Sequence, residues 1–440
     1  MTQAVNHVAL LPLYAAAGTA VLVLLTDLFL GRHQVLAGLL GTAATVVAAI
    51  VPRHTGTFCT GDLCSWVVTS RAALLALLFA ALTAGVLALA APSLRRGYAP
   101  PGEFSFLLTC AMVGGIVVAY AGDLITLIVG LETLTLPLYV LVGLRRRRTS
   151  PAGTSAAVTF FLVSVISTAI ALLGAALLYA ATGALHLTAL TSATGPLAPL
   201  ASAGTALLVI GFAFKVAAVP LHAWAPATYD GAPLPVAAYL STASKLGGVI
   251  ALAAIVQRLD TGPTIAVLAV LTMTVGNLVA LRQTRMVRLL AWSSVAQAGY
   301  ILAPLAAGAA GVEAALAYAT FFVLLEFVAF AAVTALRGPA AADGGALSAY
   351  RGAGRHSRWL GAALVLALAG LAGLPPGLAG LFAKVTVVES LISTGWGWLA
   401  GVVALNAVIA LAYYVRVAAL LYTPPEIPSP APPPVAPDPA

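Results

Sequence analysis

Four of the ionisable side chains that lie in long apolar segments of this 440-residue chain could form a charged row: Glu132, Lys215, Lys245 and Lys384. A charged group at membrane depth costs about 3 kcal/mol or more, so each is a candidate functional residue. The chain has no other lysine, and one glutamate leaves a surplus of positive charge. Burial favours the neutral amine, whereas a neighbouring carboxylate favours the ammonium. A row of lysines balanced in this way can pass protons; the alternative is a static ion pair between helices.

Proline stands beside two of these lysines. Lys215 precedes Pro220, and the run 375–377 of two prolines and a glycine precedes Lys384. Proline removes an intrahelical hydrogen bond. Broken helices at membrane depth are tolerated where the freed backbone lines a polar cavity, often at matching positions of two repeats. The pattern predicts two broken helices, with simple kinks as the alternative.

Other polar residues near these segments allow alternative roles. His222 either bridges two spans in a proton path or caps the broken helix at the interface. Tyr229 and Asp230 are typical of a turn before the next helix. Glu326 and Glu389 lie in apolar segments, and the pattern assigns them no partner.

The elements that hold these residues must be membrane helices. Apolar residues make up 61% of the chain and charged residues 8%, with a mean hydropathy of +1.04, whereas soluble proteins carry about 25% charged residues. We therefore expect an all-α polytopic membrane protein in which the seventh and twelfth spans are broken, and no nucleic-acid partner. The thirteen predicted spans are 8–30, 34–52, 66–92, 102–120, 123–144, 153–181, 199–219, 233–256, 262–281, 287–308, 312–337, 359–395 and 398–422. The first has no basic leader or small-residue cleavage site and is expected to remain a span.

The arginines predict the orientation. Loops after odd-numbered spans hold fourteen of them, and loops after even-numbered spans hold only Arg53 and Arg258. Because cytoplasmic loops are rich in basic residues, the N-terminus is expected outside and the C-terminus inside. Cys59 and Cys64 then lie outside, where they either form a disulfide or remain two free thiols.

The five spans that separate the two predicted breaks imply a repeated unit. We expect a three-helix segment at 1–98, a five-helix unit at 99–258, an inverted second copy at 259–422 and a disordered Pro-rich tail at 423–440. An odd number of helices in each unit makes the copies inverted. The chain shows no Walker loop, dinucleotide fingerprint or CxxC pair, so no cofactor is expected in it.

Several motifs resemble subunit N of the proton-pumping NADH-quinone oxidoreductase, bacterial complex I, over nearly the whole chain. They are Asp123 to Leu141 with Glu132 and Pro137, Phe214 to Trp224, Gly231 to Pro235, Ser241 to Lys245, Arg288 to Ser294 with Gly299 and Tyr300, Leu371 to Pro375, Phe382 to Lys384, and Tyr413 to Val417. The lysine of the Thr-Ala-Ser-Lys245 motif favours subunit N over its antiporter-like sister subunits L and M and over Mrp-type antiporter subunits.

The resemblance implies a subunit without a redox centre that moves protons when quinone reduction elsewhere drives it. Glu132 would pair with Lys215, Lys245 would stand at the centre of the membrane, and Lys384 would face the exit or the adjoining subunit. Quinone, flavin and iron–sulfur clusters would belong to other subunits. The expected partners are antiporter-like subunit M, small membrane subunits, protons and the lipid of a bacterial plasma membrane.

Three departures from the family pattern stand out. Thr159 replaces the usual lysine of the sixth span, which puts an entry-side relay there in doubt. Gln297 replaces the usual histidine of the tenth span and cannot titrate. The usual fourteenth span is replaced by the Pro-rich tail. Two alternatives therefore remain open: a subunit of a stand-alone Mrp-type cation/proton antiporter, and a degenerate paralogue that serves as an assembly scaffold.

Overall fold

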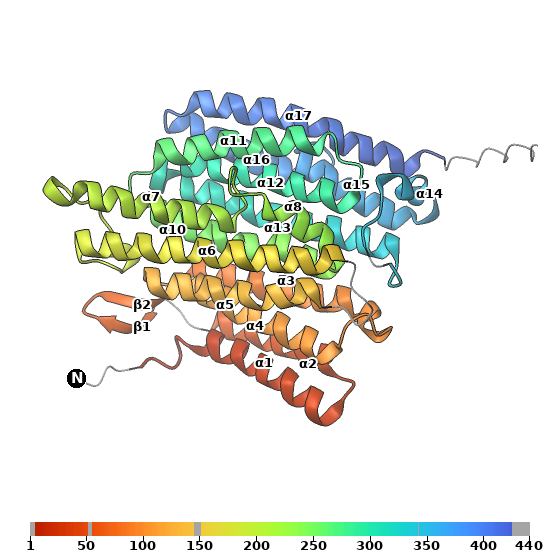
Figure 1. The fold of residues 1–440 in the computed structure, drawn as a ribbon, viewed down its shortest axis with the longest axis horizontal. Helices are drawn as coiled ribbons and strands as arrows, with labels where there is room; N and C mark the ends of the chain where they lie inside the picture. The colour runs from red at the N-terminus through yellow and green to blue at the C-terminus, as the bar shows by residue number, and fades with distance from the viewer. Residues whose placement is uncertain (1–4, 52–54, 145–150, 342, 425–440) are drawn as a thin grey trace, which may run out of the picture.

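The computed structural model describes residues 5–51, 55–144, 151–341 and 343–424, without the side chains of 151 and 152. Its helices run side by side from α1 to α17 in a bundle (Figure 1). The helices are α1 (Leu11–Leu30), α2 (Gln34–Ile50), α3 (Ser70–Arg95), α4 (Pro101–Tyr120), α5 (Leu124–Gly143), α6 (Pro151–Thr182), α7 (Ala198–Lys215), α8 (Trp224–Gly231), α9 (Leu234–Tyr239), α10 (Lys245–Val256), α11 (Gly262–Ala280), α12 (Met286–Leu305), α13 (Val312–Arg337), α14 (Ala353–His356), α15 (Arg358–Ala372), α16 (Leu378–Ser393) and α17 (Gly397–Tyr422). The Pro-rich tail from 425 onward and the arginines at 53 and 145–148 lie outside the described residues.

The membrane character follows from helix length and composition. Within the described ranges, 10 helical segments are long and apolar enough to span a bilayer, and Gln34–Ile50 and Arg358–Ala372 are shorter apolar helices. The predicted helical membrane fold with broken seventh and twelfth helices is confirmed, while the count of thirteen spans stays a prediction. The N-terminal segment and the end of α17 lie at opposite ends of the bundle (Figure 1).

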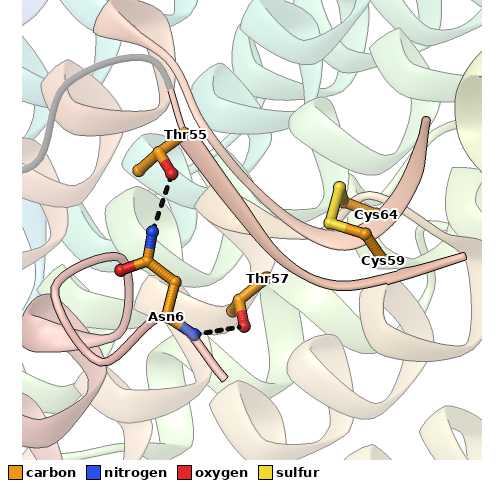
Figure 2. Close-up of a disulfide and its surroundings, with 5 residues drawn as sticks. All are labelled: Asn6, Thr55, Thr57, Cys59 and Cys64. Atoms are coloured by element: carbon orange, nitrogen blue, oxygen red, sulfur yellow. Dashed lines mark hydrogen bonds between the residues drawn. A yellow bond between two sulfur atoms is a disulfide. The ribbon is translucent and has the colours of Figure 1, made fainter. Parts of the chain in front are cut away.

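A β-hairpin precedes α3, so the prediction that the third span begins at residue 66 is wrong. Strands β1 (Thr55–Thr60) and β2 (Leu63–Val68) pair antiparallel, with Cys59 opposite Cys64. The two cysteines form a disulfide (Figure 2). Gly61, at φ +61°, turns the chain between the strands, as two-residue hairpins require. α3 begins only at Ser70, where the Thr69 hydroxyl caps it by accepting a hydrogen bond from the Ala72 amide.

The hairpin is tied to the bundle and to the N-terminal segment. The buried Trp66 ring stacks on Tyr120 at 4.9 Å between centroids, and its indole N–H donates to the Ala9 carbonyl at 2.9 Å. Asn6 binds the hydroxyls of Thr55 at 2.8 Å and Thr57 at 3.0 Å (Figure 2). This end of the bundle therefore has a defined structure where the sequence pattern predicted a helix start and a loop.

The two breaks divide long spans into separate helices. α7 ends at Lys215 and α8 begins at Trp224. α15 ends at Ala372, and α16 begins at Leu378. A Cβ built on Gly380 would lie 1.6 Å from the Gly370 carbonyl oxygen, so only glycine allows the second pair of helices to cross this closely.

Candidate functional site

An ion pair stands at the end of α7. The Lys215 ammonium donates to the Glu132 carboxylate of α5 at 2.6 Å, and the lysine and glutamate side chains are 5% and 25% exposed. The structure thus contains an ion pair between the two residues that the family resemblance pairs. Breaking such a pair by removing one partner costs about 3–5 kcal/mol when both are buried, and less here because Glu132 is partly exposed.

Hydroxyl groups surround the ion pair. The Lys215 ammonium also donates to the Ser164 hydroxyl of α6 at 2.9 Å and more weakly to Thr135 at 3.4 Å. The Tyr139 hydroxyl donates to Ser164 at 2.5 Å, and Thr168 donates to Glu132. Hydroxyls both donate and accept hydrogen bonds, so they can relay a proton without carrying charge. Sequence reasoning missed all four of these residues, because hydroxyl side chains are common in apolar helices.

The break itself fixes the position of Lys215. The lysine is the last residue of α7, where the negative end of the helix dipole favours a cation. The indole N–H of Trp224 donates to the Phe214 carbonyl at 3.1 Å, and the Val219 amide donates to the Thr272 hydroxyl at 3.0 Å. These contacts satisfy backbone groups that the break frees, as a broken helix inside a membrane requires.

Lys245 begins α10 directly after a π-helical turn, Leu240–Ser244. Such turns are frequent at functional sites. The buried ammonium donates to both the carbonyl and the hydroxyl of Ser294 on α12, each at 2.6 Å, and lies 5.7 Å from the centre of the Phe322 ring. Among the described residues, no carboxylate lies within 4 Å of this ammonium, so Lys245 differs from Lys215 in having no ion-pair partner.

Lys384 reaches back across the second break. Its ammonium donates to the carbonyls of Leu371 at 3.1 Å and Ala372 at 2.7 Å, which are the last two residues of α15. The Gln297 amide donates to the same Leu371 carbonyl at 3.0 Å. The Tyr300 ring lies 4.9 Å from the ammonium. Both broken helices therefore place a lysine at the negative end of a helix dipole.

Gln297 occupies a polar core position between four helices. It accepts from the Tyr318 hydroxyl at 2.6 Å and donates to the Tyr414 hydroxyl at 3.1 Å, and Tyr414 lies 2.5 Å from the hydroxyl of Ser293. Hydrogen bonds thus run from Ser293, beside the Ser294 that binds Lys245, through Gln297 to the carbonyl that binds Lys384. Gln297 can orient a chain of this kind but cannot itself take up a proton.

Two of the predicted supporting residues lie apart from these contacts. Thr159 is exposed on α6, away from the hydroxyls that surround Lys215. His222 is half-buried in the loop before α8, with its ring 5.1 Å from that of Trp292. The N-cap of α8 is Ala223, and it makes no side-chain cap hydrogen bond, so the capping role considered for His222 has no support.

Tyr229 and Asp230 lie inside α8, so the turn predicted for them is wrong. Asp230 accepts from the Arg285 guanidinium at 3.1 and 2.9 Å. Arg285 also donates to Asp343 at 2.8 Å, and Arg337 lies 3.4 Å from the same carboxylate. Burial alone would raise the pKa of Asp343, but the hydrogen bond and charge of Arg285 and the charge of Arg337 lower it below its ordinary value. This arginine–aspartate cluster fastens α8 to α12 and to the segment after α13.

Glu326 is the acidic group that sequence reasoning left without a role. It is fully buried on α13, and it interacts electrostatically with Lys245. Glu389, the other unassigned acid, is exposed on α16. Burial distinguishes Glu326 from Glu389, and a single sequence does not show which face of a helix is buried when the helix is apolar on every side.

Known proteins share both sequence and fold with this chain. Residues 121–410 match the family profile described as NADH:quinone oxidoreductase/Mrp antiporter, TM. Subunit N of the NADH-quinone oxidoreductase of Salinispora tropica is 61% identical in an alignment 448 positions long, which covers 96% of this chain and 86% of that protein.

Solved structures extend the likeness to the fold. A chain of respiratory complex I from Thermus thermophilus with bound aureothin superposes with a TM-score of 0.79 at 29% identity, over 95% of this chain and 92% of that one. A chain of the Mrp complex from a Dietzia species superposes with a TM-score of 0.81 at 23% identity, over 96% and 82%. The second likeness, at this identity, is one of fold alone.

Proposed function

Since the chain belongs to the NADH:quinone oxidoreductase/Mrp antiporter family, and within it to subunit N of NADH-quinone oxidoreductase, we propose that it carries protons along a row of Glu132, Lys215, Lys245 and Lys384. The chain is a membrane subunit of the proton-pumping complex, and the electron carriers and quinone belong to other subunits. The observation that carries the proposal is the Glu132–Lys215 ion pair at the end of a broken helix.

The proposed mechanism is electrostatic. Shortening or lengthening the contact between Glu132 and Lys215 changes how tightly the lysine holds its proton. A released proton can leave through the hydroxyls around Lys215 and pass to Lys245. From there the hydrogen bonds through Ser293, Tyr414 and Gln297 lead toward Lys384. Because these groups interact, each apparent pKa of proton release belongs to the whole row and not to a single residue.

The surrounding architecture is also proposed. Residues 99–258 and 259–422 form two inverted five-helix units, which the matching breaks after Lys215 and after Ala372 support. The N-terminus and the hairpin face the outside of a bacterial plasma membrane, and the C-terminus faces the cytoplasm, as the arginine-rich loops suggest. The expected neighbours are antiporter-like subunit M and the small membrane subunits of the complex.

Glu132→Gln tests this function in the assembled complex, in sealed vesicles given an electron donor and quinone. The glutamine keeps the shape but removes the charge that pairs with Lys215, so proton pumping is expected to fall at least about tenfold. Glu389→Gln, the same change at an exposed acid of α16, is the matched control and should pump like the wild type. Normal pumping by assembled E132Q would rule the proposed row out.

A stand-alone cation/proton antiporter is the second candidate, favoured by the fold likeness to the Mrp complex chain. The two functions differ in what drives the ion. Purified with its natural partners, the chain is expected to pump protons only when quinone is reduced. Sodium-dependent proton movement without any quinone chemistry would favour the antiporter.

A further inference from the structure

A buried acid on α13 has no hydrogen-bond partner. Glu326 is 0% exposed, and neither carboxyl oxygen has a partner among the described residues. Leaving a buried polar group without a hydrogen-bond partner is unfavourable, and more so when the group is charged. Such a carboxyl must either hold a proton or have its charge balanced by a nearby cation.

Lys245 is the cation placed to do this. α13 packs against both the π-helical turn and α10, which begins with Lys245. Phe322, whose ring lies 5.7 Å from the Lys245 ammonium, precedes Glu326 by one helical turn and so shares its face of α13. The lysine and the glutamate interact electrostatically. Glu326 also interacts electrostatically with the phenols of Tyr229 on α8 and Tyr414 on α17.

Lys245 and Glu326 lie on packed helices but do not form a direct ion pair. Lys245 gives its hydrogen bonds to the carbonyl and hydroxyl of Ser294, and Glu326 is not within 4 Å of it. A direct ion pair would hold the proton on the lysine, as a static structural contact does. A pair without direct contact can exchange a proton through bridging water, which costs little more than a direct hydrogen bond.

α13 also reaches the position where the row lacks a titratable side chain. Tyr318, two turns before Glu326, donates to Gln297. Gln297 cannot bind a proton, so the described contacts between Lys245 and Lys384 run through hydroxyls, an amide and a carbonyl and include no carboxylate, histidine or further lysine. Glu326 lies beside this stretch and can hold the proton that leaves Lys245.

We propose that Glu326 is a proton-binding site that exchanges a proton with Lys245 through a bridging water. The N–H bond of the ammonium breaks and an O–H bond forms on the carboxylate, so the charged pair becomes a neutral amine and a neutral acid. No net charge moves into or out of the site. The inference rests on the proposed function, because it gives the central lysine of that row its acceptor.

Glu326→Gln in the assembled complex tests the inference. The glutamine preserves volume and polarity but cannot take a proton, so quinone-linked pumping is expected to fall at least about tenfold. Glu326→Asp keeps a carboxyl and should restore most of the pumping. Glu313→Gln, an exposed acid at the start of the same helix, is the matched control and should match the wild type.

Infrared difference spectra between acidic and alkaline pH give a readout that a packing role would not move. The wild-type complex should show the carbonyl band of a protonated carboxyl that shifts in E326D and disappears in E326Q. Should E326Q fail to assemble, Glu326→Thr takes its place with the same expectations. Wild-type pumping by assembled E326Q, or a carboxyl band unchanged by the substitution, would overturn the inference.

The two proposals fail in different ways. If E132Q loses pumping while E326Q keeps it, the row stands and Glu326 is not part of it. If E132Q itself pumps normally, the proposed function is wrong, and the inference about Glu326 falls with it.

Discussion

Gly248→Ala is the most specific perturbation of the ion-pair geometry, because it changes no charged or hydrogen-bonding side chain. A Cβ added at Gly248 of α10 would lie 2.9 Å from the Lys215 Cβ and 2.9 Å from the Val216 Cγ1. Ordinary contacts of such a carbon begin at 3.4 Å, so α7 must retreat by about 0.5 Å. Overpacking of this kind costs about 1–3 kcal/mol.

A matched control isolates the steric cost. Gly401 lies in helix α17, and a Cβ added there meets nothing within 4 Å. Both substitutions gain the same helix propensity, about 0.5–1 kcal/mol. The difference in stability between G248A and G401A is therefore the overpacking cost alone. Thermal unfolding of the two assembled complexes measures it.

The displacement of Lys215 also has a functional consequence, which is measured separately from stability. A misplacement of 1 Å can cost about a hundredfold in a reaction that depends on alignment, so a 0.5 Å shift of Lys215 is expected to lower pumping about tenfold. Quinone-linked pumping in sealed vesicles measures the effect, and G401A should pump like the wild type. If G248A pumps and unfolds like G401A, then the close approach of α10 to Lys215 is not required, and the reasoning is refuted.

Three further outcomes follow from other parts of the structure. Because its arginine neighbours hold the pKa of Asp343 below the ordinary 3.8, the carboxylate stabilises the fold above that pH. The wild type should therefore have a larger free energy of unfolding than D343N, and this difference should vanish as the pH falls through the lowered pKa. A difference that grows in acid would contradict this. Cys59 and Cys64 should react with a thiol reagent only after reduction, as mass spectrometry would detect, and replacing both with Ala should cost about 2 kcal/mol because the closed loop is short. Ser164→Ala removes one acceptor from the Lys215 ammonium, a loss of about 1.5–3 kcal/mol for a bond to a charged group; a shift of the pH profile of pumping is expected, and an unchanged profile would show that this hydroxyl is dispensable.

The sequence predicts the helical membrane fold and its two breaks well, for a clear physical reason. A bilayer demands long apolar helices, and proline inside them removes a hydrogen bond, so both signals are local. The three lysines are also visible, because a charged residue inside an apolar segment is rare. The Glu132–Lys215 pair could be anticipated from the family resemblance.

The hairpin could not be read in the same way. Residues 64–68 form a short apolar run, which fits a strand as well as the start of a helix. The cap at Thr69 was the available signal for the true start of α3. The apolar residues 66–68 directly before Thr69 extended the predicted span to residue 66.

The environment of the lysines depends on contacts between helices distant in sequence. Ser164 and Glu132 meet Lys215 from two other helices, and Glu326 approaches Lys245 from a helix that follows it by many residues. No local pattern encodes such encounters, because these helices are apolar on nearly every face. Helix packing therefore decides which polar side chains become neighbours, and only a structure gives that packing.

The central claim is that protons cross this subunit along the lysine row, and Lys245 is its midpoint. The most direct measurement is the number of protons pumped for each quinone reduced by the assembled complex with Lys245→Met. Methionine keeps the length of the side chain without its charge, so the ratio is expected to fall while the complex remains assembled. An unchanged ratio in an intact complex would contradict the claim.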